Sequence, residues 1–496
     1  MQTFRRRADI LAEHWRERPP HLFVGGLDVE SESHSSIAIQ DPATGEALGR
    51  CPSGNPRDVE RAVASARRAI KGPLRTLDED QRRDRVAKVA RLLEGDAEDL
   101  MILHALETGR PVRHVRMNDV KQAILAFRYY AGWCGKLTTE HVELGDTSGT
   151  VVQHPRALVG IACDDRQPLA SVAPAAAAAL AAGCAVVVVC PDTMPLALLR
   201  LAELIHEAGL PPGAFNLVPG RTPTYEALAQ HAAISVLCHQ GPVDAGRRMM
   251  VLAAKSNLKP VHLQLGGKTS AIVCEDASLR RASRVAVQHG LHARGGDPEG
   301  LQRLLVHRSV YEEVASLVAH HAREVVVGDP MDEHTELGAV ASEARMKQIL
   351  AYVALGRKEG ASLVAGGSRF VDGAASQGTF VLPSVFVQGR GDMRVFREDN
   401  EGPFLVLVPF DDDSEAVDMV QSLSLGLGVS VWTQDGGRAR KLAYALDTGV
   451  VWFNTHGVRH PGLLRTGRGL SGGFAEGGRP GIDRFTQTTT FIREDG

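Results

Sequence analysis

Short apolar runs alternate with helical patterns along two long stretches of this chain, and this alternation limits its fold more than any other feature. In the first stretch the runs are AVVVVC (185–190), AFNLVPG (214–220), ISVLC (234–238) and PVHLQL (260–265), separated by segments with apolar residues at helical spacing. A second series starts near residue 268 with SAIVC and ends with VVWFN. Strands that are apolar on both faces and joined by helices are typical of parallel sheets covered on both sides. We therefore predict an α/β fold with two parallel sheets in successive parts of the chain.

The rest of the chain has simpler patterns. Residues 57–71, 80–93 and 117–131 carry apolar positions at helical spacing, so we expect the first part to be helical. Between 137 and 163 the pattern changes to short extended runs, which suit a hairpin. The last segment, 483–495, is rich in β-prone residues, and we expect it to form an edge strand.

Residues 168–191 carry no charge and are long enough to resemble a membrane span. A spanning helix needs ~20 strongly apolar residues. Alanine dominates this run instead, Pro174 and Gly183 interrupt it, and its VVVV end is typical of a strand. We predict a buried helix followed by a core strand, and no membrane partner.

Length, charge and cysteine content exclude several classes of protein. A chain of 496 residues exceeds what one hydrophobic core usually serves, so we expect more than one domain. A net charge of -3 argues against a nucleic-acid partner. The seven cysteines form no CxxC pair and are odd in number, so neither a disulfide framework nor a zinc ribbon is expected. They fit a protein of the reducing cytoplasm.

Several segments resemble the aldehyde dehydrogenase superfamily, and together they span nearly the whole chain. They are DPATGEALGRCPSGNPRDVERAVASARRA (41–69), the run 179–220, LQLGGKTSAIVCEDASL (263–279), GLGVSVWTQD (426–435) and VVWFNTHG (450–457). The resemblance implies a Rossmann-like nucleotide-binding domain, an α/β catalytic-type domain and a β oligomerisation arm. By this resemblance we expect residues 1–136 and 152–264 in the first domain, 265–480 in the second, and 137–151 with 481–496 in the arm.

The resemblance also implies three chemical groups, and this chain lacks all three. The family's cysteine nucleophile falls on Pro298, and no cysteine lies between 274 and the C-terminus. The base glutamate of the family's E-L-G-G-K motif is Gln264, whose amide cannot accept a proton at neutral pH. The asparagine of its P-W-N-F-P segment, which helps form the oxyanion hole, is Arg166. Losing the nucleophile abolishes the covalent route, whatever the other groups contribute.

The cofactor positions that the resemblance implies are also altered. The lysine and glutamate of the family's V-V-L-K-P-A-E pattern are Cys190 and Thr193. Gly241 and Gly246 keep the glycine spacing of the pyrophosphate turn, but Pro242 removes one N–H donor from it. A carboxylate survives at Asp399, at a further cofactor contact of the family. We expect no cofactor, with NAD as the alternative.

We therefore predict an aldehyde dehydrogenase-like pseudoenzyme with no catalytic residues, serving as a structural or regulatory subunit. A homo-oligomer is the first expectation, and assembly with an active aldehyde dehydrogenase is the second. The segments HARGGDPEGLQRLLVHRSVYEE and VVWFNTHGVRHPG are similar to the cysteine-lacking units of aldehyde dehydrogenase family sixteen. The competing reading is a conventional NAD(P)-dependent aldehyde dehydrogenase.

The active-site pocket that the resemblance implies has two other possible uses in this chain. Arg166 and Arg459 would clamp a small anion if both faced the pocket. Neutralisation of Arg166 by nearby carboxylates is favoured over this clamp; the candidates are Asp164, Asp165, Asp297 and Glu299. His289 and His292 have the spacing of a helical metal pair, but a pocket-lining role is favoured over a metal site.

Overall fold

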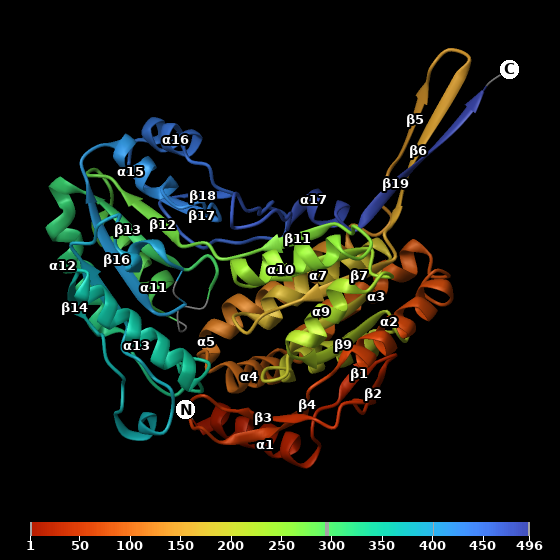
Figure 1. Cartoon of the computed structure of the whole chain (residues 1–496), viewed down its shortest axis with the longest axis horizontal. Helices are drawn as coiled ribbons and strands as arrows, with labels where there is room; N and C mark the ends of the chain where they lie inside the picture. The colour runs from red at the N-terminus through yellow and green to blue at the C-terminus, as the bar shows by residue number, and fades with distance from the viewer. Residues whose placement is uncertain (1, 293–296, 400, 495–496) are drawn as a thin grey trace.

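Two sheets of seven strands each form the centres of the two halves of the protein in the computed structural model, which describes residues 2–292, 297–399 and 401–494 (Figure 1). The first sheet has the order β11-β10-β7-β8-β9-β1-β2. Its parallel strands are β7 (Leu158–Ala162), β8 (Ala185–Pro191), β9 (Phe215–Gly220), β10 (Val236–Gln240) and β11 (Val261–Gln264). The predicted parallel sheet is confirmed.

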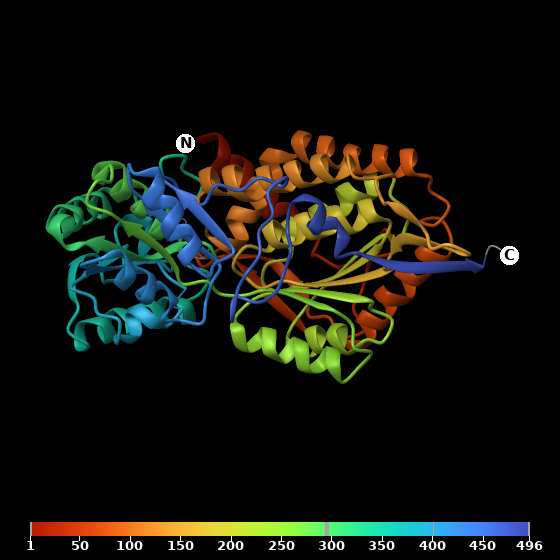
Figure 2. The same ribbon diagram turned by 90° about the horizontal axis from the view of Figure 1, so that it is seen from above.

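Helices cover both faces of the first sheet. The connecting helices are α7 (Pro168–Ala182), α8 (Leu196–Glu207), α9 (Thr222–Gln230) and α10 (Val243–Ala254). Figure 2 shows the sheet between two helical layers, with the orange helices of the early chain on one side and the green α10 on the other. Helix α7 is almost wholly buried and ends at Gly183, whose φ of 93° needs a glycine. The predicted buried helix and core strand are confirmed, and no described helix has the length and apolar character of a membrane span.

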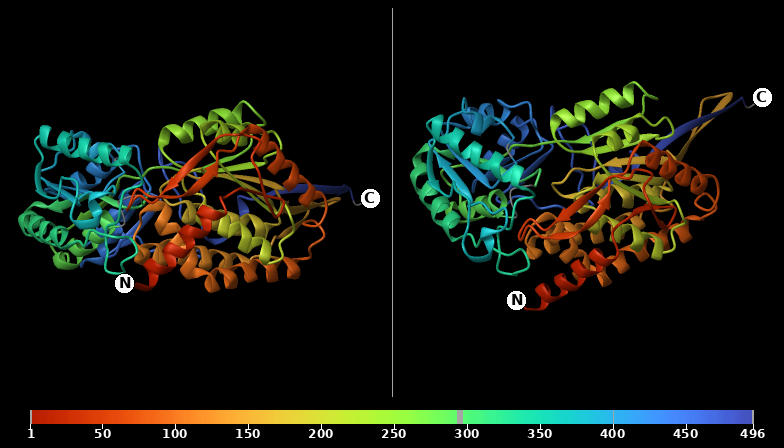
Figure 3. Two further views of the ribbon diagram at one scale, coloured as in Figure 1. Left: turned by 90° about the horizontal axis from the view of Figure 1, so that it is seen from below. Right: turned by 60° about the horizontal axis from the view of Figure 1, so that its bottom comes forward.

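The first part of the chain contains strands as well as the predicted helices. The helices α2 (Pro56–Lys71), α3 (Glu79–Gly95) and α6 (Lys121–Ala131) confirm the predicted helices, the last preceded by a π-helical turn at Val115–Val120. However, β1 (Leu22–Val24) and β2 (Leu27–Val29) extend the first sheet, and β3 (Ser36–Gln40) pairs with β4 (Ala47–Pro52). Two further helices were not predicted, α1 (Gln2–Glu17) and α4 (Ala97–Thr108). Helix α1 lies along the outside of the molecule (Figure 3).

The second sheet has the order β14-β15-β16-β13-β12-β17-β18 and is parallel except for β14. Its strands are β12 (Thr269–Val273), β13 (Leu301–His307), β14 (Ser362–Ala365), β15 (Ser384–Val387), β16 (Phe404–Phe410), β17 (Gly428–Trp432) and β18 (Val450–Phe453). Its larger helices are α11 (Leu279–Gly290), α12 (Tyr311–Glu324), α13 (Glu343–Lys358), α15 (Asp413–Gln421) and α16 (Gly436–Ala445). Alternating strands and helices over 269–453 thus build a second α/β layer structure, as predicted.

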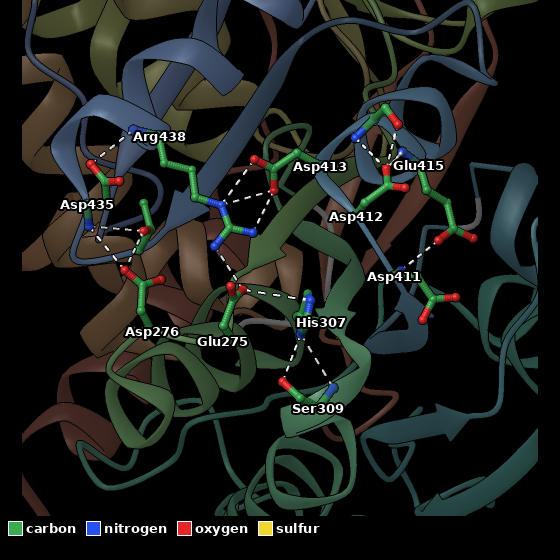
Figure 4. A network of polar contacts seen from close by, with 12 residues as sticks. Glu275, Asp276, His307, Ser309, Asp411, Asp412, Asp413, Glu415, Asp435 and Arg438 are labelled. Carbon is green, nitrogen blue, oxygen red and sulfur yellow. Dashed lines mark hydrogen bonds and ion pairs between the residues drawn. The ribbon is translucent and has the colours of Figure 1, made fainter.

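A carboxylate network around Arg438 closes the carboxyl ends of β12, β13, β16 and β17 (Figure 4). The Arg438 guanidinium donates to Asp413 Oδ1 at 2.7 Å and to Glu275 Oε2 at 2.8 Å. Asp276 accepts from the Thr433 hydroxyl at 2.8 Å and thereby ties the ends of β12 and β17 together. The amino ends of β12 and β13 lie at the opposite edge of the sheet, toward the first half of the protein.

A three-stranded antiparallel sheet of order β19-β6-β5 projects from the body as an arm (Figure 1). It consists of β5 (Thr139–Glu143), β6 (Thr147–Pro155) and β19 (Thr486–Glu494). The register between β6 and β19 runs without interruption from Thr486 opposite Pro155 to Glu494 opposite Thr147. The predicted hairpin and terminal edge strand are confirmed, and the two segments pair with each other.

Candidate active site

The site expected from the sequence lies where the chain passes from β11 to β12. Residues 265–268 make this connection, and two predicted site residues pack directly against its glycines. A Cβ atom on Gly267 would come within 2.7 Å of the Pro298 carbonyl oxygen, and one on Gly266 within 2.0 Å of Asp399 Oδ2. Gln264 is the last residue of β11 and precedes these glycines. The fold therefore gathers Gln264, Pro298 and Asp399 around one short segment.

Pro298 occupies the predicted nucleophile position just before β13. The residue is buried, and its ring nitrogen and carbons carry no group that can attack a carbonyl. Residues 293–296, which precede it in the segment used for the resemblance, lie outside the described residues.

Two buried thiols lie near Gln264, but neither is placed to act as a nucleophile. Cys163 and Cys238 line a cavity of about 30 Å³ together with Gln264, enough for one or two water molecules. Burial raises the pKa of both thiols, so each is held as the weakly nucleophilic neutral form. Both thiols are therefore poor candidates for the missing nucleophile.

A buried ionic cluster surrounds Pro298. Arg459 donates to Glu299 Oε2 at 2.7 Å and to Asp297, so the carboxylates on both sides of the proline share one guanidinium. Arg465 donates to Glu299 Oε1 at 2.5 Å and also pairs with Glu476. Although burial opposes ionisation, the charges of Arg459 and Arg465 hold the pKa of Glu299 below its usual range. Both oxygens of Glu299 are engaged, so this carboxylate is a poor general base.

Arg166 belongs to a separate ion-pair group. Its guanidinium pairs with Asp164 and lies 3.7 Å from Glu401 Oε1, while Arg345 donates to the other oxygen of Glu401 at 2.6 Å. The alternative, a clamp of Arg166 with Arg459, has no support here, because each guanidinium is bound by its own carboxylates. The favoured neutralisation of Arg166 is found, but through Asp164 and Glu401 in place of Asp297 or Glu299.

Among the described residues, no carboxylate lies with His289 and His292 at metal-ligand spacing. His289 packs edge-on against His456 with ring centroids 5.2 Å apart, and His292 Nε2 lies 3.9 Å from Glu336 Oε2. Burial lowers the pKa of His289 to about 4, so the ring is neutral. Within the described residues, the one group of three side chains with metal-ligand spacing is exposed on α12 and consists of His320, His321 and Glu324. Both predicted histidines line a cavity instead, as favoured from the sequence.

Packing alone accounts for the glycines of the expected pyrophosphate turn. A Cβ atom on Gly246 would meet the Leu265 side chain at 2.7 Å, and one on Gly241 would meet the His239 ring at 2.6 Å. Helix α10 follows with Pro242 as its N-cap residue and no side-chain cap. The glycine spacing therefore has a structural reason that needs no phosphate.

The other expected cofactor contacts are already used within the protein. Cys190 is fully buried in β8 and presents no group to the surface. Asp399 accepts a hydrogen bond from Gln302 Nε2 at 3.0 Å and packs on Gly266.

Four charged residues of the site were not singled out from the sequence. They are Lys268, Arg345, Arg465 and Glu476. Lys268 is 1% exposed, donates to the Val395 carbonyl at 2.9 Å, and burial lowers its pKa to about 7. Lys268 stands in the L-G-G-K run already compared with the family motif, but no role was predicted for it. The other three stand alone in their segments, so only pairing across the fold reveals their roles.

Comparison with known proteins places these features in a family. A sequence model described as the aldehyde dehydrogenase family matches residues 29–491. Retinaldehyde dehydrogenase 3 of Mus musculus is 33% identical over 473 residues, covering 95% of this chain and 92% of that protein. The NAD+ complex of an aldehyde dehydrogenase from Bacillus cereus has 31% identity and a TM-score of 0.94, covering 97% of this chain and 98% of that one. Indole-3-acetaldehyde dehydrogenase AldA of P. syringae, solved as a cysteine-to-alanine mutant with NAD+ and IAA, has 29% identity, a TM-score of 0.95 and 99% coverage of both chains.

Proposed function

Because the chain belongs to the aldehyde dehydrogenase family, we propose that it is a catalytically silent member whose fold serves as a structural or regulatory subunit. The observation that carries this proposal is the buried Pro298 at the cysteine position, enclosed by Asp297 and Glu299 in their ion pairs. Aldehyde oxidation through a covalent intermediate needs a thiolate at this point. The carboxylates on either side of the proline are held by arginines and do not replace it.

Loss of the two supporting groups strengthens the proposal. The Gln264 amide cannot act as a general base. Arg166, at the oxyanion position, is paired with Asp164. Removing one oxyanion donor costs about 10²–10³ in rate, and losing a general base costs typically ~10²–10⁴. These losses are not additive, but without a nucleophile no combination of the remaining groups restores the covalent route.

We further propose that the chain does not bind NAD in the manner of an active dehydrogenase. Cys190 is a buried thiol at the position of a ribose-binding lysine, and Asp399 is bonded to Gln302. Pro242 supplies no N–H at the start of α10, and Asp244 in the first turn of that helix would repel a pyrophosphate. The residues present do not fit the cofactor.

Calorimetric titration with NAD+ tests this proposal. The Bacillus cereus aldehyde dehydrogenase, which has been solved with NAD+, is the positive control. We expect saturable heat for the control and none for this protein at millimolar NAD+. Saturable binding with a micromolar Kd would contradict the proposal and would point to a nucleotide sensor.

A second candidate function is that of a conventional NAD(P)-dependent aldehyde dehydrogenase, and the relatives that carry this name support it. That function would require steady production of NADH from an aldehyde, without the thiolate and base described above.

The arm supports homo-oligomer formation as the structural role. Apolar side chains project from both of its outer strands and from their connecting turn; they are Val142, Leu144, Phe491 and Ile492. Strand β19 is an edge strand of the arm, and β18 is an edge strand of the second sheet. The backbone groups along such edges pair readily with another chain. Pairing with an active aldehyde dehydrogenase is the alternative, and a single self-associated species purified from the native host would remove it.

The two resembling segments support a relation to the cysteine-lacking units of aldehyde dehydrogenase family sixteen. Both carry residues of the buried cluster, with Asp297 and Glu299 in the first and Arg459 in the second.

The free cysteines, six of them buried and Cys134 partly so, support the cytoplasm as the compartment.

A further inference from the structure

A cavity of about 230 Å³ opens beside the ionic cluster, between the two halves of the protein. Its walls come from three places: the helical turn α5 (Val112–His114) with the π-helical turn that follows, the end of α11, and the loop after β18. Figure 1 shows α5 and α11 on opposite sides of the boundary between the halves. At ~30 Å³ for each water molecule in the liquid, the space equals about eight waters. It is large enough for a small metabolite.

Three arginines line this cavity at different depths. Arg113 is at the mouth with its side chain 45% exposed, whereas the side chains of Arg110 and Arg459 are only 4% and 13% exposed. The two deep guanidinium groups are each held on one side by carboxylates: Arg110 by Asp119 at 2.6 Å, and Arg459 by Glu299 and Asp297. These two arginines are therefore fixed in position.

Each of the two deep guanidinium groups keeps N–H groups for a ligand. Nη1 is the only side-chain donor of Arg110 that forms a hydrogen bond within the described residues, which leaves its Nε and Nη2. Arg459 uses Nε and Nη2, which leaves its Nη1. Arg113 approaches Glu336 only to 3.6 Å. A ligand that enters this cavity meets donors from three directions.

The histidines on the wall add neutral polar atoms. His114 and His292 meet edge-on with ring centroids 5.6 Å apart, and the buried Nε2 atom of His114 has no hydrogen-bond partner in the described part of the chain. Burial lowers the pKa of His114 to about 3, so the ring carries no charge at neutral pH and can donate or accept.

The lining is poor in acceptors. Asp297 is its only carboxylate among the described residues, and its Oδ1 atom already accepts from Arg459 and from the Glu299 backbone N–H at 2.9 Å. A cation would meet the positive charge of three guanidinium groups, and an apolar ligand would leave their N–H groups unsatisfied. Guanidinium groups instead match the oxygens of carboxylates and phosphates.

We propose that this cavity binds a small oxyanion, a phosphate or carboxylate carried by a compact metabolite, through Arg110, Arg113 and Arg459. In place of a clamp of Arg166 with Arg459, the cavity offers Arg110 and Arg113 from the segment around α5, and Arg459 from the loop after β18. The inference goes beyond the proposed silent scaffold, because it needs neither a nucleophile nor a nucleotide. If the protein is a regulatory subunit, the bound oxyanion would be the ligand to which it responds.

Calorimetric titration of the full-length protein tests the inference, with inorganic phosphate and malonate in separate arms at constant ionic strength. We expect saturable binding of at least one of them. Tighter binding of phosphate would indicate a phosphate ligand, and tighter binding of malonate would indicate a carboxylate. Arg113→Gln, at the exposed mouth, should weaken that binding about tenfold, the effect of losing one charge-assisted hydrogen bond. Asn118→Trp, also at the mouth, should abolish it by filling the entrance.

Arg116→Gln is the matched control. Arg116 is one helical turn further along, has a similarly exposed side chain at 49%, pairs with Glu333 and does not line the cavity. We expect it to bind as the unmodified protein does. No saturable heat with either probe, or equal binding by the Arg113→Gln and Arg116→Gln proteins, would overturn the inference. NADH formation plays no part in these measurements, so the inference and the silent-scaffold proposal fail independently.

Discussion

Glu299 is the central residue of the buried ionic cluster around Pro298, because each of its two oxygens is bound by a different arginine. It is 1% exposed, and it joins Arg459 on one side to Arg465 on the other. A buried carboxylate of this kind is stable only while its partners remain. The cluster thus explains how acidic side chains can stand beside Pro298 without serving as bases.

The Glu299→Gln protein should be markedly less stable. Removing the charge leaves two buried guanidinium groups underbalanced, which costs about 3 kcal/mol in the free energy of unfolding. Urea unfolding followed by tryptophan fluorescence measures this change. Glu343→Gln, which breaks an exposed pair with Lys347, is the control and should shift stability by less than about 0.5 kcal/mol. Equal midpoints for the two variants would show that the cluster does not stabilise the fold.

Restoring the cysteine alone should not restore activity. In the Pro298→Cys protein, a thiol would stand among Asp297, Glu299 and their arginines, with Gln264 and Arg166 still at the base and oxyanion positions. We expect NADH formation from propanal to stay at the background rate. Turnover by this single variant would mean that the rest of the site is still competent.

At the scale of elements, the sequence predicts best where burial is continuous along the chain. Helix α7 and strand β8 follow from one apolar run, because nearly all of their residues are apolar and buried. Strands β1 and β2 were missed because each has three residues, and β1 joins the sheet through the distant β9 at Phe23 and Leu217. The sequence alone shows that the nucleophile, base and oxyanion groups are missing. The ion pairs of Glu299 could not be predicted, because they join residues that only the fold brings together. The domain boundaries at 136, 152 and 264 stay a prediction.

Strand β10 carries a buried histidine that predicts an acid-sensitive stability. Burial lowers the pKa of His239 from 6.5 to about 4 in the folded protein. The unfolded chain therefore binds a proton between these values while the folded chain does not, so the stabilisation is complete above pH 6.5 and is lost as the pH falls to 4. The loss from this group is on the order of 3 kcal/mol.

Comparing unfolding midpoints at pH 7.5 and pH 5 measures this effect. The His239→Phe protein should lose less stability on acidification than the unmodified protein, since the titrating ring is gone. His34→Gln removes an exposed histidine and should leave the pH dependence unchanged. If His239→Phe and the unmodified protein lost equal stability, the ring would not be held neutral.

At the scale of the whole molecule, the arm is the feature that a lone chain does not explain. It extends away from both sheets and exposes Phe491 and Ile492, at 60% and 75% (Figure 1). Apolar side chains on a projecting edge strand are typical of an interface between subunits. We therefore expect the protein to be a homo-oligomer in solution.

Replacing both Phe491 and Ile492 with Asp should dissociate the oligomer. Light scattering after size-exclusion chromatography gives the mass, which should fall toward the 53.2 kDa of one chain. Leu27→Asp, at an apolar side chain 67% exposed on β2, is the control and should keep the oligomer mass. A monomeric mass for the unmodified protein would refute the assembly.

The central claim is that this member of the aldehyde dehydrogenase family does not oxidise aldehydes. The most direct test is absorbance at 340 nm over many turnovers, with pure protein, propanal and NAD+, beside an active relative at equal concentration. We predict no NADH above the rate without protein, because Pro298 offers no thiolate. Steady NADH production that scales with protein concentration would contradict the account.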